Sequence, residues 1–346
     1  MADGEHMAVE LAEQPRVLAS MVARWPDLVA QVERVVPEDL AGVAFVARGS
    51  SDNAAVLGRY EAERGSGRPA GLVAPSLHTR YDADVDYSGY LAVALSQSGE
   101  TPEIVTTAER LRHAGARVVA ITNEPASALA LVADAHLALG AGAELAVPAT
   151  KTVTAQMLAV LAVADGLRAK RGRAAAIGPA ALAALPDAIA VLLADLAGPR
   201  DLASRWVGAD RLVVVARGAM LAAALEVALK VRETAGVFAQ GTSTADLAHG
   251  PIASIAPGAA VLLLDGGGPG SSDVREMSQR LAGIAADAQC AGGAPGDAVA
   301  LPTGLGDSLE VLAATVRGQQ LAYAWARAVG RDPDAPEGLS KVTRTR

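Results

Sequence analysis

The tetrapeptide Val-Ala-Arg-Gly occurs twice in the chain, at residues 46–49 and again at 215–218. Each copy follows an apolar run and precedes a helical pattern, as expected when a chain contains two copies of one structural unit. Around both copies, short runs of valine, alanine and leucine alternate with helical patterns. This alternation predicts β-α-β units and therefore a parallel sheet with helices on both faces. The repeat thus indicates two similar α/β domains, for which 346 residues suffice.

The apolar runs also predict where the domains begin and end. Strands are expected near residues 42–48, 70–74, 91–95, 116–121 and 135–139 of the first half, and near 211–216, 259–264 and 297–301 of the second. A long helix is expected over about 150–171, and the mixture of charge, glycine and proline at 170–187 is typical of a linker. The predicted parts are therefore a helical region at 1–35, a first domain at 36–175, a second domain at 186–330 and a tail at 331–346.

The composition argues against several classes of function. Only 3% of the residues are aromatic, so the core is built from alanine, valine and leucine, and platforms that stack nucleic-acid bases are not expected. The net charge of −8 argues against binding to DNA or to an anionic membrane. A single cysteine, Cys290, allows no internal disulfide and no cysteine-rich metal site, and no clustered metal-ligand pattern predicts a metal or redox cofactor. No segment has the pattern of a signal peptide or a membrane span, so we expect a cytoplasmic protein.

The segment Leu-Ser-Gln-Ser-Gly-Glu-Thr-Pro-Glu, residues 95–103, joins an apolar run to the start of a helix. Thr101 followed by Pro102 is typical of a helix N-cap with proline at the first helical position. At such a junction the free backbone N–H groups and the helix dipole favour an anion, and short hydroxyl and amide side chains add donors. The segment therefore predicts a phosphate site. The alternative is a polar turn whose hydroxyls only cap the helix.

The two halves differ at this point, and the difference favours a phosphate site. In the second half the equivalent segments read Leu-Leu-Leu-Asp-Gly-Gly-Gly-Pro-Gly at 262–270 and Arg-Gly-Ala-Met-Leu-Ala-Ala-Ala at 217–224. Hydroxyls that served only as caps should be present about equally in both copies. The first half alone has them in these segments, at the carboxyl ends of two strands, where open α/β sheets bind ligands. These residues are Ser50, Ser51, Ser96, Ser98 and Thr101.

The second half carries a charged stripe on a helix instead. In the helix predicted over 219–236, Glu226, Lys230 and Glu233 fall at i, i+4 and i+7, so they lie on one side of a largely apolar helix. A carboxylate beside an ammonium in a pocket is suited to moving protons, and a solvated stripe is the alternative. His249 lies in a His-Gly-Pro turn, where it is either structural or functional. Lys341 lies in the tail of residues 331–346, whose acids and prolines are otherwise typical of a frayed terminus.

Five segments, in this order, carry a family resemblance. They are RGSSDNAA (48–55), SQSGETPE (96–103), GAELAVPATKTVTAQ (142–156), ALEVALKVRETAG (224–236) with HGP (249–251), and DPDAPEGLSKVT (332–343). Together they resemble the double sugar-isomerase (SIS) domain of glutamine–fructose-6-phosphate aminotransferase and of shorter relatives, the non-glutaminase glucosamine-6-phosphate deaminases. The resemblance runs from Glu13 to Lys341. It implies two tandem SIS domains, each a flavodoxin-like sandwich of three layers with a parallel sheet in the middle.

The resemblance also implies a role for each site residue. Ser51, Ser96, Gln97, Ser98 and Thr101 would hold the sugar phosphate, and Val147 would contact the sugar through its backbone with Glu144 close by. Glu233 would move a proton between C1 and C2, supported by Lys230 and Glu226. His249 would open the pyranose ring, and Lys341 would engage the carbonyl carbon of the open-chain sugar, with an imine as one option. In this family the neighbouring subunit supplies the histidine, which implies a homodimer.

Three departures from the aminotransferase pattern limit what the resemblance implies. The chain has neither the glutaminase domain nor its cysteine nucleophile, Gln240 stands in place of a glutamate, and Ala149 stands in place of a serine. The expected function is therefore deamination and isomerisation of glucosamine 6-phosphate to fructose 6-phosphate and ammonia without glutamine. The alternatives are a deglycase or an isomerase for another hexosamine or fructosamine 6-phosphate, and a sugar-phosphate sensor without activity. No helix-turn-helix precedes the first domain, which disfavours the sensor.

Overall fold

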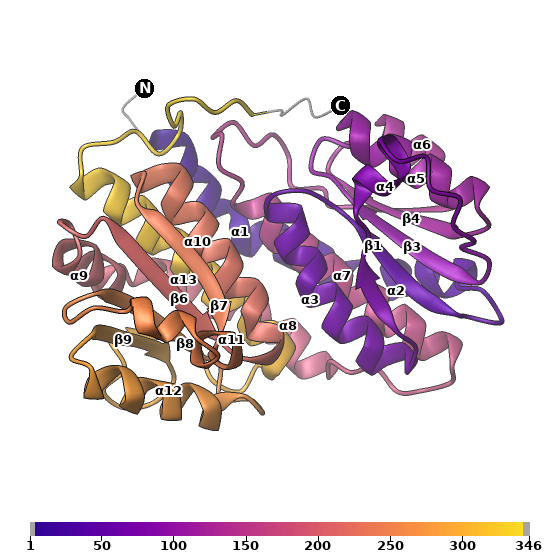
Figure 1. Cartoon of the computed structure of the whole chain (residues 1–346). Helices are drawn as coiled ribbons and strands as arrows, with labels where there is room; N and C mark the ends of the chain where they lie inside the picture. Colours follow the sequence, from indigo (N-terminus) through magenta and orange to yellow (C-terminus); the bar gives the residue numbers. More distant parts are fainter. Residues whose placement is uncertain (1–3, 342–346) are drawn as a thin grey trace. The chain divides into compact units, whose positions relative to one another are not determined.

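The computed structural model describes residues 4–341, which contain two five-stranded parallel sheets (Figure 1). These residues form two compact units, each with one sheet. The amino-terminal unit comprises residues 16–143 and 151–179, and the carboxy-terminal unit comprises 4–15, 144–150 and 180–341. The predicted fold class, two tandem α/β domains with parallel sheets, is confirmed.

The sheet of the amino-terminal unit has the strand order β2-β1-β3-β4-β5. Its strands are β1 (Gly42–Val46), β2 (Ala70–Leu72), β3 (Tyr90–Leu95), β4 (Arg117–Thr122) and β5 (Ala135–Ala138). The helices of the unit are α2 (Trp25–Val35), α3 (Ser50–Ser66), α4 (Pro75–Thr79), α5 (Pro102–His113), α6 (Ala128–Val132) and α7 (Lys151–Lys170). Apolar side chains of α5 and α6 cover one face of the sheet, and α2, α3 and α7 pack together on the other.

The sheet of the carboxy-terminal unit has the strand order β10-β9-β8-β6-β7. Its strands are β6 (Arg211–Ala216), β7 (Phe238–Ser243), β8 (Ala260–Asp265), β9 (Asp287–Gly292) and β10 (Val299–Ala300). Its helices are the first part of α1 (Glu5–Ala23), α8 (Pro179–Ala194), α9 (Ala197–Arg205), α10 (Leu221–Ala235), α11 (Thr244–Ala248), α12 (Ser271–Gly283) and α13 (Asp307–Ala328), with short 3₁₀ turns η1 (Gly218–Met220) and η2 (Pro251–Ser254). Side chains of α11 and α12 cover one face, and α10 packs against α13 on the other.

The two sheets are copies in topology as well as in sequence. When the second sheet is read from its β7 edge, the order β7-β6-β8-β9-β10 repeats the order β2-β1-β3-β4-β5. The two Val-Ala-Arg-Gly segments lie at the ends of the corresponding strands β1 and β6. The apolar runs did not predict β7 and β9, because their sequences Phe-Ala-Gln-Gly-Thr-Ser and Asp-Ala-Gln-Cys-Ala-Gly mix polar residues and glycine.

The predicted linker is shorter than the composition indicates. Helix α8 begins at Pro179, inside the segment 170–187, and continues past Pro186. Proline is well tolerated at the first helical position, and the alanines and leucines that follow are strong helix formers. Because Leu182 and Leu185 are buried, packing holds this helix in spite of its internal proline. The connection between α7 and α8 is therefore residues 171–178.

Helix α7 is long and apolar enough, by length and composition, to cross a membrane. Within the structure, 89% of its apolar window is buried, which is typical of the core helix of a globular protein. The bent pair of α8 and α9 passes the same test only when the two helices are counted as one span, and they meet at 49°. These helices are therefore weak evidence for a membrane protein.

Candidate active site

The loops after β1 and β3 carry the hydroxyl residues predicted to bind phosphate. Because β2 and β3 lie on opposite sides of β1, the two loops leave the sheet at its topological switch point, where open α/β folds bind ligands. Ser51 lies in the first turn of α3, and residues 96–101 connect β3 to α5. Ser51 and Ser96 are buried, whereas Gln97, Ser98 and Thr101 are half-buried. The structure thus brings both hydroxyl-bearing loops to the same side of one sheet, at the carboxyl ends of its strands.

The helices that follow these loops begin without side-chain caps. Gly49 is the N-cap residue of α3, and Thr101 occupies the N-cap position of α5 but makes no side-chain cap hydrogen bond. The first-turn N–H groups of both helices are therefore not satisfied by a capping side chain, and such groups favour an anion. This observation disfavours the alternative in which the hydroxyls only cap the helices.

The loop between β3 and α5 orients its hydroxyls as donors. Ser96 Oγ accepts a hydrogen bond from the Gly99 N–H at 3.1 Å, and Ser98 Oγ accepts one from the Glu100 N–H at 3.2 Å. A hydroxyl whose oxygen is engaged in this way keeps its own hydrogen to donate, and Ser96 Oγ also lies 3.4 Å from Thr101 Oγ1, where either hydroxyl is able to donate. Gly99 has φ +66°, and a Cβ on it would lie 2.1 Å from Ser127 Oγ, so the turn requires glycine.

An arginine joins the two loops in each half of the chain. The Arg48 guanidinium donates to both carboxylate oxygens of Glu103, at 3.0 and 3.1 Å. In the carboxy-terminal unit, Arg217 pairs with Asp273 at 2.8 Å. Because this ion pair occurs in both halves while the hydroxyls occur in one, we assign it to loop structure rather than to the ligand.

The carboxy-terminal unit has a carboxylate where the amino-terminal unit has its donor loop. Asp265 ends β8, as Leu95 ends β3. Its two carboxylate oxygens accept hydrogen bonds from the Gly267 N–H at 2.9 Å and from the Ser271 hydroxyl at 2.7 Å. The N–H and hydroxyl groups that could bind an anion thus donate to the Asp265 carboxylate instead, which disfavours a second phosphate site.

The charged stripe on α10 is buried rather than solvated. The side chains of Lys230 and Glu226 are 1% and 0% exposed, and the Lys230 ammonium lies 3.5 Å from Glu226 and forms a closer ion pair with Glu233. Burial alone lowers the pKa of Lys230, but the charges of Glu233, Glu226 and Glu144 outweigh it, so the pKa lies above its usual value. Lys230 is therefore an ammonium at neutral pH. Glu233, with 22% of its side chain exposed, is the member of the group that reaches the surface.

Lys341 is held in place rather than frayed. Its ammonium donates to Glu144 Oε2 at 2.9 Å and to the Ala146 carbonyl at 2.7 Å. The Glu144 side chain is fully buried, and its other oxygen accepts a hydrogen bond from the Thr150 N–H at 3.0 Å. Because residues 144–150 and Lys341 belong to the same unit as α10, the structure brings Glu144 and Lys341 into the unit that carries Glu233.

Two further predicted residues, Val147 and His249, are half-buried and exposed, respectively. The Val147 N–H donates to the Asp334 carbonyl at 2.8 Å, so any backbone contact of Val147 with a sugar has to use its carbonyl oxygen. His249 directly follows α11 and is exposed, and its ring makes no hydrogen bond or ion pair with residues 4–341. Across the same residues, no group of three or more His, Cys, Asp or Glu side chains is placed to hold a metal ion.

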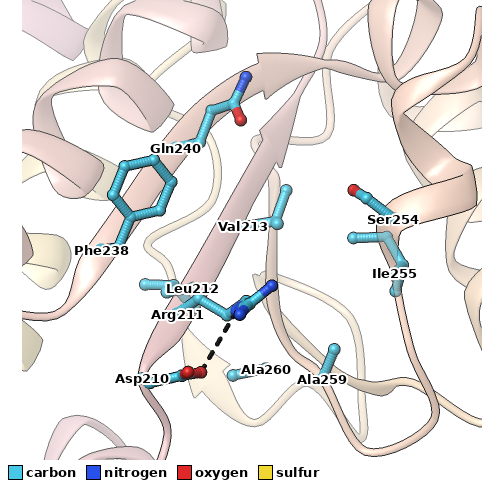
Figure 2. A pocket seen from close by; sticks show the side chains of 10 residues that line it. All are labelled: Asp210, Arg211, Leu212, Val213, Phe238, Gln240, Ser254, Ile255, Ala259 and Ala260. Carbon is cyan, nitrogen blue, oxygen red and sulfur yellow. Dashed lines mark hydrogen bonds and ion pairs between the residues drawn. The ribbon is translucent and has the colours of Figure 1, made fainter.

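Gln240, one of the departures from the aminotransferase pattern, lines a separate hollow. Figure 2 shows this cavity of about 390 Å³ over the sheet of the carboxy-terminal unit, with Phe238 and Gln240 of β7 on one side and Ser254 and Ile255 on the other. This cavity lies toward the amino end of β6, because Asp210 and Arg211 line it. The loops described above instead follow the carboxyl ends of strands. The glutamine therefore changes the lining of this hollow.

Sequence reasoning missed two residues that support the Lys341 region. Glu10 of α1 accepts hydrogen bonds from the N–H groups of Leu145 and Ala146. Asp334 accepts from the N–H groups of His6 and Met7, at 2.9 and 2.7 Å. Both contacts join segments more than 130 residues apart, so no local pattern could have indicated them. The one available signal was the position of Asp334 in the segment that resembles the family.

The comparisons with known proteins agree with the topology. The SIS-domain family model matches residues 42–165 and 207–282. The chain belongs to the SIS-domain family. Among curated proteins it is similar to glutamine–fructose-6-phosphate aminotransferases from Aeropyrum pernix, at 33% identity, and Symbiobacterium thermophilum, at 31%, each over 97% of this chain. The chain spans 56% and 58% of the length of those two relatives.

Solved structures place the whole chain within the same fold. A protein from Silicibacter pomeroyi described as a candidate phosphosugar isomerase has a TM-score of 0.84 and 29% identity, covering 95% of this SIS chain and 99% of that protein. A glucosamine-6-phosphate deaminase from Thermotoga maritima has a TM-score of 0.78 and 22% identity, covering 99% and 100%. At that identity the similarity shows the fold. The resemblance seen in the sequence is therefore confirmed at the level of the family.

Proposed function

We propose that this SIS protein is a sugar-phosphate isomerase that converts glucosamine 6-phosphate and water to fructose 6-phosphate and ammonia without glutamine. The observation that carries the proposal is the presence of two held groups in the same unit. Glu233 belongs to a buried ion-pair group, and Lys341 is held by the buried Glu144. A sensor that only binds a sugar phosphate has no need of a carboxylate base and a held amine. The uncapped helices and the hydroxyl donors at the switch point support a phosphate ligand.

The chemistry that we propose begins with ring opening. His249 takes the proton of the C1 hydroxyl and returns a proton to the ring oxygen, which gives an open-chain aldehyde. Lys341 engages the carbonyl carbon C1, and its contact with Glu144 sets its direction. Glu233 then removes the C2 proton and returns it at C1, while the carbonyl oxygen takes up a proton and the amine nitrogen gives one up, so that C1 becomes an alcohol and C2 an imine. Water adds to the resulting imine carbon, and ammonia leaves with fructose 6-phosphate as the second product.

The same proposal covers the assembly and the location of the protein. We propose a homodimer in which His249 acts in the site of the neighbouring subunit. Its exposed ring, without a hydrogen bond to residues 4–341, supports this role, because an imidazole that serves its own subunit is usually oriented by a second group. A cytoplasmic location agrees with the single cysteine and the acidic net charge of −8.

The direct test is a panel of hexosamine 6-phosphates and of amino-acid adducts of fructose 6-phosphate, with ammonium and hexose phosphate measured for each. Ammonium release from glucosamine 6-phosphate alone, at rates unaffected by added glutamine, is the expected result. Release of an amino acid from an adduct would favour a deglycase, and isomerisation without ammonium would favour a simple isomerase. Saturable binding with no turnover of any compound would favour a sensor. Synthesis of glucosamine 6-phosphate that requires glutamine would contradict the proposal.

A further inference from the structure

We propose that Glu10 is a positioning residue that fixes the loop of residues 144–150 and, through this loop, the amine of Lys341. The inference rests on the proposed function, because only there does Lys341 touch the substrate. Glu10 itself lies on α1 and makes none of the proposed substrate contacts.

Glu10 and Lys341 act on the same residue of the loop. The Glu10 side chain is buried, and its Oε1 accepts hydrogen bonds from the N–H groups of Leu145 and, at 3.3 Å, Ala146. The Ala146 carbonyl in turn accepts from the Lys341 ammonium at 2.7 Å. Ala146 thus donates to Glu10 and accepts from Lys341, so a shift of the loop away from α1 moves an acceptor of the amine.

The tail that carries Lys341 is fastened to the same helix. The carboxylate of Asp334 accepts from the His6 and Met7 N–H groups at the start of α1, and its backbone carbonyl accepts from the Val147 N–H at 2.8 Å. Helix, loop and tail therefore form a closed arrangement in which each pair is joined directly. Together, the three contacts restrain the loop more than any one of them alone. The loop cannot move away from one partner without straining the contacts to the others.

The far end of the loop is linked to α1 through Gln319 of α13. Gln14, one turn after Glu10, donates to the Gln319 side-chain oxygen at 3.0 Å, and Gln319 donates to the Thr150 carbonyl at 3.2 Å. Because one end of the loop bonds to α1 directly and the other is linked to it through Gln319, we expect the loop to move with this helix rather than independently.

The charge of Glu10 is difficult to explain by stability alone. Its Oε2 is buried and accepts no hydrogen bond from residues 4–341, and an unsatisfied buried carboxylate oxygen destabilises a fold. A glutamine would keep the Oε1 contacts without placing a charge there. Costs of this kind concentrate at functional sites, where a side chain that fixes a loop is retained in spite of its effect on stability.

The test uses Glu10→Ala, with Glu10→Gln as the conservative variant and Val9→Ala as the control. Val9 is the neighbouring residue on α1 and is 53% exposed. We expect Glu10→Ala to lower kcat by about ten- to a hundredfold, with KM for glucosamine 6-phosphate little changed, since small displacements of a reacting group have effects of this size. Glu10→Gln keeps the acceptor and should stay within about threefold of wild type. Val9→Ala should leave both constants unchanged.

Hydrogen exchange measured by mass spectrometry separates this inference from the proposed function. Peptides covering 144–150 and 331–341 should exchange faster in Glu10→Ala than in wild type, whereas peptides from β3 and β8 should not change. In a Lys341→Ala background, Glu10→Ala should cause no further fall in kcat, because its effect acts through that amine. Wild-type protein that turns over no sugar phosphate would refute the proposed function, and exchange would still test the Glu10 contacts.

Native exchange in both peptides of Glu10→Ala, or a native kcat, would overturn the inference. If Glu10→Ala does not fold, Asp334→Ala opens the same arrangement from the side of the tail. It should accelerate exchange at 144–150 and lower kcat without raising KM. Native exchange at 144–150 in that variant would equally contradict the role assigned to Glu10.

Discussion

Lys230 lies between two carboxylates of its own helix, Glu226 and Glu233, and the proposed mechanism gives each of the three residues a different role. Burial lowers the pKa of Lys230, and the charges of Glu233, Glu226 and Glu144 raise it by more, so the amine stays protonated. A permanent ammonium cannot accept the C2 proton, but Glu233, which pairs with it, carries a carboxylate that can. The buried Glu226 balances the ammonium, and the partly exposed Glu233 is the base that we propose.

We expect Glu233→Gln to lower kcat by about a hundredfold or more while phosphosugar binding stays nearly native, because the amide keeps size and hydrogen bonding but cannot take a proton. Turnover and calorimetric binding of glucosamine 6-phosphate measure the two effects separately. Retention of more than about a tenth of the wild-type kcat would exclude Glu233 as the base, given the usual contribution of a positioned base.

The charge on Glu10 predicts a pH-dependent stability. Burial raises its pKa above the usual value of 4.5, the Leu145 N–H lowers it, and the charge of Glu144 raises it again, with a net increase. A carboxyl with a raised pKa contributes most stability below its unfolded pKa and loses it as pH rises through the folded value. Glu10→Gln should therefore have a higher Tm than wild type at pH 7 to 8, and the difference should shrink on acidification through the glutamate range. Equal Tm values at neutral pH would show that the charge carries no net cost.

At the scale of secondary-structure elements, the two copies of the domain differ in the loops that follow corresponding strands. The loop after β3 presents hydroxyls whose oxygens are already engaged by N–H groups, whereas the loop after β8 directs its donors onto Asp265. The shared strand order shows that the difference lies in the loops and not in the sheets. A parallel sheet brings its loops to one edge, so a few substitutions there change the ligand without changing the core.

This difference predicts one phosphate site per chain. Ser98→Ala combined with Thr101→Ala should raise KM strongly with little change in Tm, because both side chains are half-buried loop groups. The matched control, Ser271→Ala with Ser272→Ala, should leave KM unchanged. It should lower Tm slightly, because the hydrogen bond from Ser271 to Asp265 is lost. Calorimetry that found two equivalent phosphosugar sites per chain would contradict the assignment.

The elements that could be predicted are those whose pattern of apolar and polar residues reflects how deeply they are buried. Strand β3 was predictable because Leu91–Leu95 are all buried, and a strand covered on both faces is a continuous apolar run. Strand β7 lies at a sheet edge and mixes exposed, half-buried and buried residues, and β9 is half-buried over most of its length, so neither forms such a run. The start of α8 was missed because its proline and the preceding glycine are equally typical of a linker.

At the scale of the whole molecule, local sequence patterns place residues on loops but do not show which distant segments lie together. Residues 144–150 follow the first sheet in the chain and lie in the unit of the second. The Glu10 contact with this loop spans 135 residues, and a single glutamate on α1 looks no different from its neighbours Glu5 and Glu13. Only the family resemblance assigned Lys341 a function, since the composition of the tail indicates a frayed terminus. Contacts over such separations depend on tertiary structure, which local patterns do not report.

The proposed homodimer makes a prediction for the complete assembly. If His249 serves the site of the neighbouring subunit, a hybrid of one His249→Ala chain and one Lys341→Ala chain has one site with both groups intact. That site combines Lys341 of the first chain with His249 of the second, and the other site lacks both. Hybrids purified through two different tags should therefore show about half of the wild-type activity per dimer, because a two-fold dimer has two equivalent sites. Each parent variant alone should be nearly inactive.

If His249 instead serves its own chain, every site of the hybrid lacks one group, and the hybrid should be as inactive as its parents. Inactive hybrids that sediment as dimers would thus refute the shared site, while retaining the homodimer itself.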